Sequence, residues 1–188
     1  MLTFTDYLLN AMDSNYQVDV VYIDFSKAFD KINHDILMKK LGNIGIHGNL
    51  LRWIESYIRN RSQAVCLKGY RSSYLPVPSG VPQGLHLGPV LFSIYINDIS
   101  SVLHDVDHLH YADDTKLFTV VTRPEDCLRL QLGLDRLSQY CKNNQLFLNA
   151  EKCCLMTYSR KKQPISYNYN LDGNSLATLF RLLRAFVI

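Results

Sequence analysis

The sequence predicts an α+β fold in which an antiparallel-rich sheet carries helices on one face. Apolar residues recur at helical spacing in several segments, and short β-branched and aromatic runs mark strands between them. When residues 32–75 are set aside, the remaining order is strand, helix, strand, strand, helix, strand, which is the split βαβ (ferredoxin-like) order. We therefore expect residues 32–75 to be an insertion that projects from the sheet.

The first half of the chain starts with a helix followed by a buried strand. Residues 3–13 have apolar side chains at helical spacing, with Thr3 or Thr5 as the capping residue. Residues 18–24 form a nearly continuous β-branched and aromatic run, which is typical of a strand buried on both faces. The other expected elements are helices over residues 32–41 and 50–58, a hairpin of residues 63–68 and 70–75 closed near Gly69, and a loop over residues 76–88.

The second half contains a hairpin between two helices. The stretch Ala112-Asp113-Asp114 is predicted to be a tight turn that joins two strands. Thr122, Pro124 and Glu125 form a helix-start signal, and Asn143-Asn144 ends that helix. The expected ranges are a helix over residues 89–99, strands over 108–111 and 115–121, a helix over about 124–142, a strand over 153–158 and a weak strand over 168–171.

Composition indicates one globular unit. The chain has 188 residues, of which 47% are hydrophobic and 20% charged, and this excludes an intrinsically disordered protein. The net charge of +3 permits a nucleic-acid partner without requiring one. The five cysteines form neither a zinc spacing nor an even disulfide framework, and no apolar run reaches the ~18 residues of a membrane span. We expect a soluble intracellular protein of the cytoplasm or nucleus, with no membrane partner.

Three carboxylates are the chemically informative residues. Asp24 ends the first predicted strand, and Asp113 and Asp114 lie in the hairpin turn, so the predicted sheet can bring all three to one edge. Carboxylate oxygens suit Mg²⁺, and two such ions can stabilise the attacking and leaving oxygens of a phosphoryl displacement. Taken alone, however, the Asp pair is better interpreted as an ordinary turn sequence, and Asp24 as a strand-end or helix-cap acid.

Four longer motifs add a family resemblance. The segment from Tyr22 to His34 (YIDFSKAFDKINH) resembles the first palm motif of reverse transcriptases from non-LTR, LINE-type (jockey-like) retrotransposons. Residues 79–84 (SGVPQG), continuing to Leu87-Gly88-Pro89, resemble their second motif. Residues 111–114 (YADD) match their YxDD turn, and residues 148–153 (LNAEKC) resemble the LNxxK motif that follows it. The resemblance covers about residues 2–160 and implies a polymerase palm with a partial fingers insertion.

The resemblance implies a role for each catalytic position. Asp24, Asp113 and Asp114 would be catalytic and would hold two Mg²⁺ ions, which Mn²⁺ can replace. The backbone carbonyl of Phe25 would add a metal ligand. Phe29 would lie under the incoming sugar and disfavour a ribose 2′-hydroxyl; without the motif it would be interpreted as a core aromatic.

Three further positions would contact the substrates. Gln83 and Gly84 would line the nucleotide and the template strand, although Pro82-Gln83-Gly84 could equally be only a turn. Lys152 would lie near the leaving pyrophosphate and supply a proton or a positive charge; an exposed structural lysine is the alternative. His34 and His110 flank the motifs and receive no chemical role.

Two features depart from the family pattern. Leu85 stands where the family usually has a serine, next to the expected nucleotide site, which puts fidelity or activity in doubt. We also expect an incomplete copy: residues 1–160 would form the palm with partial fingers, residues 161–188 a truncated tail, and the remaining fingers, thumb and endonuclease would belong to a longer polyprotein.

Two functional hypotheses follow. The first is an RNA-directed DNA polymerase core, a nucleotidyltransferase whose partners are an RNA template, a DNA primer and dNTPs. The second is a catalytically inactive retrotransposon remnant that acts at most as an RNA-binding or interaction module. A basic RNA-binding domain of other ancestry is a distant third, because such a domain would not need the acidic turn.

Overall fold

The computed structural model describes residues 2–84 and 86–181. They divide into two compact units: unit 1 takes its residues from segments 1–26, 99–143 and 148–188, and unit 2 from segments 27–98 and 144–147. The predicted insertion, residues 32–75, lies inside unit 2. Leu85 and residues 182–188 lie outside the described residues. Each unit is considered by itself below.

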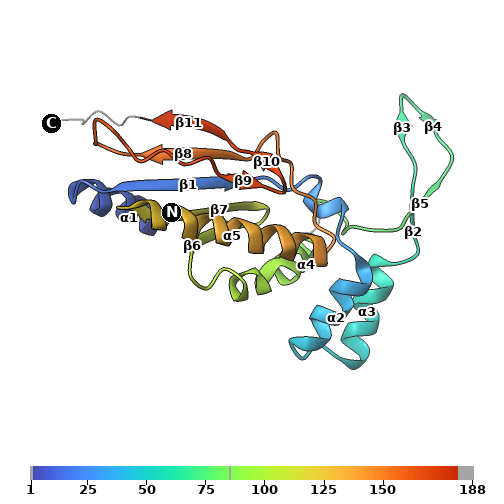
Figure 1. The fold of residues 1–188 in the computed structure, drawn as a ribbon. Helices are drawn as coiled ribbons and strands as arrows, with labels where there is room; N and C mark the ends of the chain where they lie inside the picture. Colours follow the sequence, from blue (N-terminus) through green and yellow to red (C-terminus); the bar gives the residue numbers. More distant parts are fainter. Residues whose placement is uncertain (1, 85, 182–188) are drawn as a thin grey trace. The chain divides into compact units, whose positions relative to one another are not determined.

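Unit 1 is built on a five-stranded sheet with the strand order β11-β8-β1-β7-β6 (Figure 1). Its strands are β1 (Gln17–Ile23), β6 (Asp107–Tyr111), β7 (Asp114–Val121), β8 (Cys154–Tyr158) and β11 (Ala177–Arg181). β1 is antiparallel to both β7 and β8, and β7 is antiparallel to β6, whereas β11 runs parallel to β8. The order β8-β1-β7-β6 is the one that a split βαβ unit produces. The predicted antiparallel-rich α+β sheet is therefore confirmed.

Helices cover both faces of this sheet. On one face, α1 (Leu2–Asp13) places Phe4 and Tyr7 edge-on against Phe118 of β7, with ring centroids 5.0 and 4.9 Å apart. On the other face, Arg129 of α5 (Pro124–Asn143) donates a hydrogen bond to Thr119 Oγ1 at 2.9 Å. We expected helices on one face of the sheet, and the structure adds α1 on the second face. The reason is that β1 is apolar on both of its faces, so both must be covered.

The start of α5 is fixed by the residues that the sequence singled out. Pro124 is the first helical residue, a position where its missing N–H costs nothing. The carboxylate of Asp126 accepts hydrogen bonds from the backbone N–H and hydroxyl of Thr122, at 2.9 and 2.8 Å, and from the N–H of Arg123 at 3.2 Å. These bonds hold the pKa of Asp126 below its usual value, against the effect of burial, and anchor the strand-to-helix connection.

The segment after residue 160 contains regular structure. β9 (Asn170–Leu171) and β10 (Asn174–Ser175) form a small hairpin, and β11 adds an edge strand to the main sheet. The side chains of Tyr169, Leu171 and Leu176 are buried. Only residues 168–171 were expected to form a weak strand, so the described part of this segment is more ordered than the predicted tail.

Unit 2 combines helices with a hairpin. Its helices are η1 (Ala28–Asp30), α2 (His34–Asn43), α3 (Gly48–Ile58) and α4 (Leu87–Ile96), and η2 (Asn97–Ser101) crosses the unit boundary. Asn33 caps α2 by accepting a hydrogen bond from the Ile36 N–H at 3.0 Å. Helix α2 contacts both α3 and α4, and the buried side chains of Leu37, Leu41 and Phe92 lie in the core of this unit. Two short antiparallel ladders follow α3: β2 (Arg61–Gln63) pairs with β5 (Leu75–Val77), and β3 (Cys66–Leu67) with β4 (Tyr70–Arg71).

Candidate active site

Asp24 and Asp114 lie at the same end of the sheet in unit 1. In the antiparallel register of β1 and β7, Ile23 is paired with Thr115, so continuing the register by one residue brings Asp24 opposite Asp114. Directly opposed residues of neighbouring antiparallel strands point to the same face. By strand alternation this is the face of Tyr22 and Lys116, which are also a register pair. Continued in this way, the register sets Asp24 and Asp114 on one face at this end of the sheet.

The turn that carries Asp113 is tight and conformationally unusual. Tyr111 of β6 pairs with Asp114 of β7, which leaves only Ala112 and Asp113 to connect the two strands. Ala112 has a φ of 54°, in the left-handed region that non-glycine residues rarely occupy. Asp113 is half-buried, whereas Asp114 and Tyr111 are exposed. A strained two-residue turn therefore fixes the backbone of Asp113 between β6 and β7, and such strain is concentrated at functional sites.

The LNxxK motif holds the backbone of Asp24. The Asn149 N–H donates to the Asp24 carbonyl at 2.8 Å, and Phe25 forms an isolated antiparallel bridge with Leu148. The Asp24 N–H in turn donates to the Cys153 sulfur at 3.3 Å. Burial is the main cause that raises the pKa of the Cys153 thiol, so this group stays protonated at neutral pH. Sequence reasoning missed Cys153 as a positioning residue, although its place at the end of the motif was visible.

Lys152 lies on the turn that makes these contacts. The N–H groups of Lys152 and Cys153 both donate to the Asn149 carbonyl at 3.0 Å, so that residues 149–153 form a compact turn. The Lys152 side chain is exposed. The structure thus leaves its amine accessible and fixes its backbone relative to Asp24.

Unit 2 contains the other predicted site residues. The Phe29 ring lies 4.7 Å from the Phe92 ring, centroid to centroid, and is half-buried. The Gln83 amide donates to Asp30 Oδ1 at 2.7 Å, and the Ser79 hydroxyl donates to the Asp30 carbonyl at 2.8 Å. Asp30 therefore orients the Gln83 side chain, a role that sequence reasoning missed even though Asp30 belongs to the first motif. Gly84 is exposed, with a φ of 81°.

Gly80 permits a close backbone approach beside these residues. It has a φ of 80°, and a Cβ at this position would lie 2.7 Å from the Asp30 Cα. Its N–H donates to the Ile32 carbonyl at 2.8 Å, and its own carbonyl accepts from Arg61 Nη2 at 2.7 Å. The His34 ring nitrogen Nε2 also lies 2.8 Å from this carbonyl. His34 is thus a buried structural histidine, in keeping with the absence of an assigned chemical role.

A polar cavity of about 470 Å³ adjoins the Gln83 loop within unit 2. Three cationic side chains line it, Lys27, Lys31 and Arg61, together with Asp30 and Gln83. The excess of cations makes it suited to an anionic ligand. None of the three cations was assigned a role at the sequence level, because Lys27 and Lys31 are separated from Arg61 by two helices.

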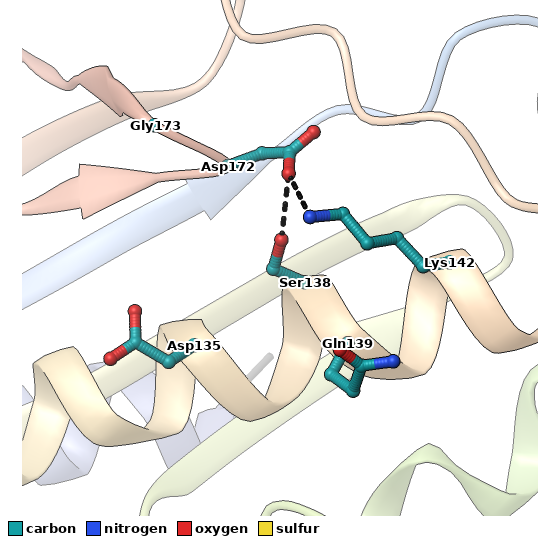
Figure 2. A pocket seen from close by; sticks show the side chains of 6 residues that line it. All are labelled: Asp135, Ser138, Gln139, Lys142, Asp172 and Gly173. Carbon is teal, nitrogen blue, oxygen red and sulfur yellow. Dashed lines mark hydrogen bonds and ion pairs between the residues drawn. The ribbon is translucent and has the colours of Figure 1, made fainter.

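A second hollow, of about 400 Å³, lies between α5 and the β9–β10 turn in unit 1 (Figure 2). Lys142 Nζ lies 2.8 Å from Asp172 Oδ1, and the Ser138 hydroxyl donates to the same oxygen at 3.1 Å. These contacts lower the pKa of Asp172 and tie the hairpin turn to the helix. No predicted site residue lines this hollow, and its polar groups already satisfy one another.

Carboxylate oxygens at this end of the sheet are donors of the kind that Mg²⁺ prefers. Among the side chains that the structure describes, no three His, Cys, Asp or Glu residues converge into a ready metal cage. Mg²⁺ does not require such a cage, because it commonly takes one or two carboxylates together with waters and substrate phosphates. Asp24 after β1, Asp114 at the start of β7 and Asp113 in the turn before it are carboxylates of this kind.

No helix in residues 2–84 or 86–181 is both long and apolar enough to cross a bilayer.

Solved structures share the fold of this chain. The chain aligns with apo telomerase from Candida tropicalis, truncated from its C-terminal domain, with a TM-score of 0.63 at 17% identity over 94% of this chain and 37% of that one. Telomerase from Candida albicans, in complex with a TWJ fragment of telomeric RNA, gives a TM-score of 0.64 at 15% identity over 94% of this chain and 32% of that one. At these identities the likeness shows the fold alone.

Sequence comparison gives the particular family. Residues 7–168 match the family described as Reverse transcriptase (RNA-dependent DNA polymerase). The RNA-directed DNA polymerase from mobile element jockey of Drosophila melanogaster is 31% identical over 83% of this chain and 18% of its own length. The Pol polyprotein from the type-1 retrotransposable element R2 of Popillia japonica is 27% identical over 86% of this chain and 28% of its own length. The chain belongs to the reverse transcriptase family, and it spans about a fifth of the length of the jockey relative.

Proposed function

We propose that this chain is the catalytic palm core of an RNA-directed DNA polymerase, which extends a DNA primer along an RNA template with dNTPs. The observation that supports the proposal is the β1–β7 register, which, when it is continued by one residue, sets Asp24 opposite Asp114, the residue that follows Asp113 of the β6–β7 turn. Unpaired carboxylates at one open sheet edge repel each other unless water or a cation separates them. An arrangement that keeps them together is suited to metal-assisted phosphoryl transfer.

The protein groups around the reaction have separate tasks. Asp24, Asp113 and Asp114 would hold two Mg²⁺ ions, with the Phe25 carbonyl as a further ligand, and these ions would stabilise the attacking and leaving oxygens. The hydrogen bonds from Asn149 and to Cys153 keep the Asp24 backbone in position. Lys152 would supply positive charge or a proton to the leaving pyrophosphate.

The substrate contacts are assigned in the same way. Phe29 would exclude a ribose 2′-hydroxyl, and Gln83 and Gly84 would line the nucleotide and the template strand. Asp30 would keep the Gln83 amide in the orientation that contacts a base. Parts of a longer polyprotein outside this chain would supply the remaining contacts to the primer and the triphosphate.

The test is primer extension on an RNA template with Mg²⁺ or Mn²⁺, comparing the unmodified chain with Asp113→Asn. We expect the substitution to reduce extension by about 100-fold or more, the loss that follows removal of one charge-stabilising group. Asp6→Asn, which neutralises an exposed acid of α1, is the matched control and should extend normally. If neither the unmodified chain nor Asp113→Asn extends the primer while both bind RNA, the chain is a non-catalytic RNA-binding remnant instead.

A further inference from the structure

Lys116 is a cation on the strand face that carries the acidic end of unit 1. It lies in β7, two residues after Asp114, so strand alternation places both side chains on one face with their Cα atoms about 7 Å apart. Across the ladder Lys116 is paired with Tyr22, which precedes Asp24 by two residues. A positive charge is therefore close to the carboxylates of the proposed metal site.

Aromatic rings hold the Lys116 ammonium on this face. Its Nζ lies 4.3 Å from the centroid of the Phe4 ring and 5.4 Å from the centroid of the Tyr22 ring. Phe4 belongs to α1 and packs against Phe118 of β7, so its ring is fixed by the helix and by the sheet. Cation–π contacts are stronger when the cation is partly desolvated, and the Lys116 side chain is half-buried. The two rings thus position this ammonium without an anion.

Neither Lys116 nor the neighbouring acids are used in an ion pair. In the part of the chain that the structure describes, the ion pairs join other residues, and none includes Lys116 or any of the aspartates Asp24, Asp113 and Asp114. A lysine with a carboxylate two positions away on the same strand face is near enough to pair with it, but here the rings of Phe4 and Tyr22 hold the ammonium instead. The carboxylate oxygens stay open, while their charge is partly balanced from a short distance.

A cation at this position has two opposite effects on the site. It lowers the mutual repulsion of the carboxylates when no metal is bound. It also repels a divalent ion that binds those carboxylates, with a Coulomb energy that falls only with the inverse of the distance. Substrate phosphates bring negative charge of their own and share the coordination of Mg²⁺, so they offset this repulsion. Carboxylates with such a neighbour bind a metal ion weakly by themselves and more tightly together with a nucleotide.

We propose that Lys116 is a fixed counter-charge of the metal site, which weakens the binding of free divalent ions and so makes metal binding depend on the substrate phosphates. It acts through the carboxylates and does not contact the substrate. The inference rests on the proposed function, because it takes Asp24, Asp113 and Asp114 to be the metal ligands. The alternative is a structural lysine whose stem covers the two rings. The experiment therefore has to separate the charge of Lys116 from its stem.

Binding of Mn²⁺ alone to the full 188-residue chain, followed by electron paramagnetic resonance of the free ion, tests this inference. Lys116→Met removes the charge but keeps an unbranched apolar stem against the rings. We expect it to tighten Mn²⁺ binding by about 5-fold in low salt, the effect of one unit charge about 7 Å from a divalent ion in water. In about 1 M salt, where the Debye length is about 3 Å, the difference should disappear.

Two variants separate the charge from packing and from net charge. Lys116→Arg keeps the charge and should bind Mn²⁺ as the unmodified chain does. Lys162→Met removes an exposed lysine beyond the end of β8, where Tyr158 is paired with Val18 at the opposite end of β1 from the acids, and it should also leave binding unchanged. Thermal unfolding gives a second measurement. Because a ligand of the folded state stabilises it, a given Mg²⁺ concentration should raise the Tm of Lys116→Met by more than that of the unmodified chain.

The outcomes distinguish Lys116 from the acids. Tighter Mn²⁺ binding by Lys116→Met, with weaker binding by Asp113→Asn, supports the counter-charge. If Asp113→Asn weakens binding and Lys116→Met leaves it unchanged, the counter-charge is overturned and the proposed function stands. Equal tightening by Lys116→Arg or by Lys162→Met also overturns it.

The position of the bound ion is tested by the same series. If Asp113→Asn leaves Mn²⁺ binding unchanged, the ion binds elsewhere and the counter-charge is overturned, while primer extension decides the proposed function separately. Far-ultraviolet circular dichroism checks that each variant is folded, and Lys116→Gln replaces Lys116→Met if that variant is not.

Discussion

Asp19 shows at the scale of one residue how the sheet tolerates a buried charge. It lies in the middle of β1 and is almost completely buried. Its Oδ1 accepts hydrogen bonds from Gln17 Nε2 and Thr157 Oγ1, both at 2.9 Å, and its Oδ2 accepts one from the Tyr169 hydroxyl at 2.9 Å. Burial nevertheless raises the pKa of this carboxyl above its usual value, because desolvation outweighs the three hydrogen bonds.

This raised pKa predicts a specific dependence of stability on pH. The folded state holds the Asp19 proton more tightly than the unfolded chain, whose pKa is roughly 3.9. The free-energy cost of burying the charged Asp19 carboxylate is absent when the pH is below the pKa of the unfolded state. This cost grows as the pH rises through the pKa of the folded state. Asp19→Asn removes this charge while its amide oxygen still accepts two bonds. We expect the free energy of unfolding of Asp19→Asn to fall less between pH 4 and pH 7 than that of the unmodified chain.

Urea unfolding at several pH values, followed by fluorescence of Trp53, measures this difference. Asp6→Asn, at an exposed position, is the control and should leave the pH dependence unchanged. The prediction would be contradicted if the free energy of unfolding changed with pH in the same way for Asp19→Asn and for the unmodified chain. Asp19→Ala should instead cost about 1–3 kcal/mol at pH 7, because it leaves the buried donors without an acceptor.

Phe29 combines a packing contact with the proposed role under the sugar. Phe29→Val removes the ring that contacts Phe92, and we expect a loss of about 1–2 kcal/mol in unfolding free energy. If the chain extends primers, the variant should also incorporate ribonucleotides more readily, because the smaller side chain leaves room for a 2′-hydroxyl. Phe92→Leu alters the fully buried partner and should cost stability without changing sugar selectivity. Equal shifts in selectivity for both variants would show that packing, not steric exclusion, is responsible.

At the scale of elements, α5 lies close to the loop before β6. A Cβ at Gly133 would lie 2.7 Å from Val106 Cγ2 and 3.3 Å from Val106 Cβ. Gly133→Ala gains about 1 kcal/mol in helix propensity, but overpacking a buried contact costs about 1–3 kcal/mol. We expect a net destabilisation, because Val106 is itself buried and its branched side chain has little freedom to move.

The double variant Gly133→Ala/Val106→Ala separates the two contributions. Val106→Ala removes the clashing methyl groups, so Gly133→Ala should be less harmful, or even stabilising, in that background. Thermal unfolding of the four chains of this mutant cycle gives the coupling energy. If the effects of the two substitutions on the free energy of unfolding simply add, the clash is relieved by movement of the helix.

The elements that the sequence predicted are those with a clear period or a clear boundary signal. β1 is a short run that is buried at nearly every position, and β7 has buried residues at every second position from Thr115 to Val121. α5 has buried positions every third to fourth residue, and Thr122 and Pro124 mark its start. The sequence largely failed to predict β9, β10 and β11. β9 and β10 have two residues each, which is too short for a measurable period, and the pairing of β11 with β8 depends on tertiary contacts. α4 begins at Leu87, two residues before Pro89, and continues as η2.

The same distinction applies to the candidate site. The positions of Asp24 after a strand and of Asp113 in a hairpin turn were predictable, because a strand end and a hairpin turn both have local signals. The contacts that hold the site were not predictable, because the Gln83–Asp30 bond and the Asp24–Cys153 bond each join two loops far apart in the chain. The cation cavity was missed for the same reason. Loop-to-loop contacts depend on the complete fold and leave no periodic trace in the sequence.

At the scale of the whole molecule, the segment after residue 160 is bound to unit 1 by reciprocal contacts. The Gln17 side chain donates to the Ile165 carbonyl at 2.9 Å and accepts from the Ile165 N–H at 2.8 Å. Gln131 of α5 makes the same pair of bonds with the backbone of Asn170, both at 2.9 Å. This segment therefore joins β1, α5 and β8, and we infer that it is part of the folding unit.

A chain that ends at residue 160 tests this inference. It lacks the buried side chains of Tyr169, Leu171 and Leu176, and burial of each large apolar side chain contributes about 1.5–3 kcal/mol. It also leaves Asp19 buried without its Tyr169 donor and removes the edge strand beside β8. We therefore expect unfolding at a much lower urea concentration, or no cooperative unfolding.

A chain that ends at residue 181 keeps all these contacts and is the matched control. Tyr169→Ala should show an intermediate loss of about 3–5 kcal/mol in the free energy of unfolding. Unfolding of the 160-residue chain at the same urea concentration as the control would mean that the segment is a dispensable tail, as its weak strand propensity had indicated.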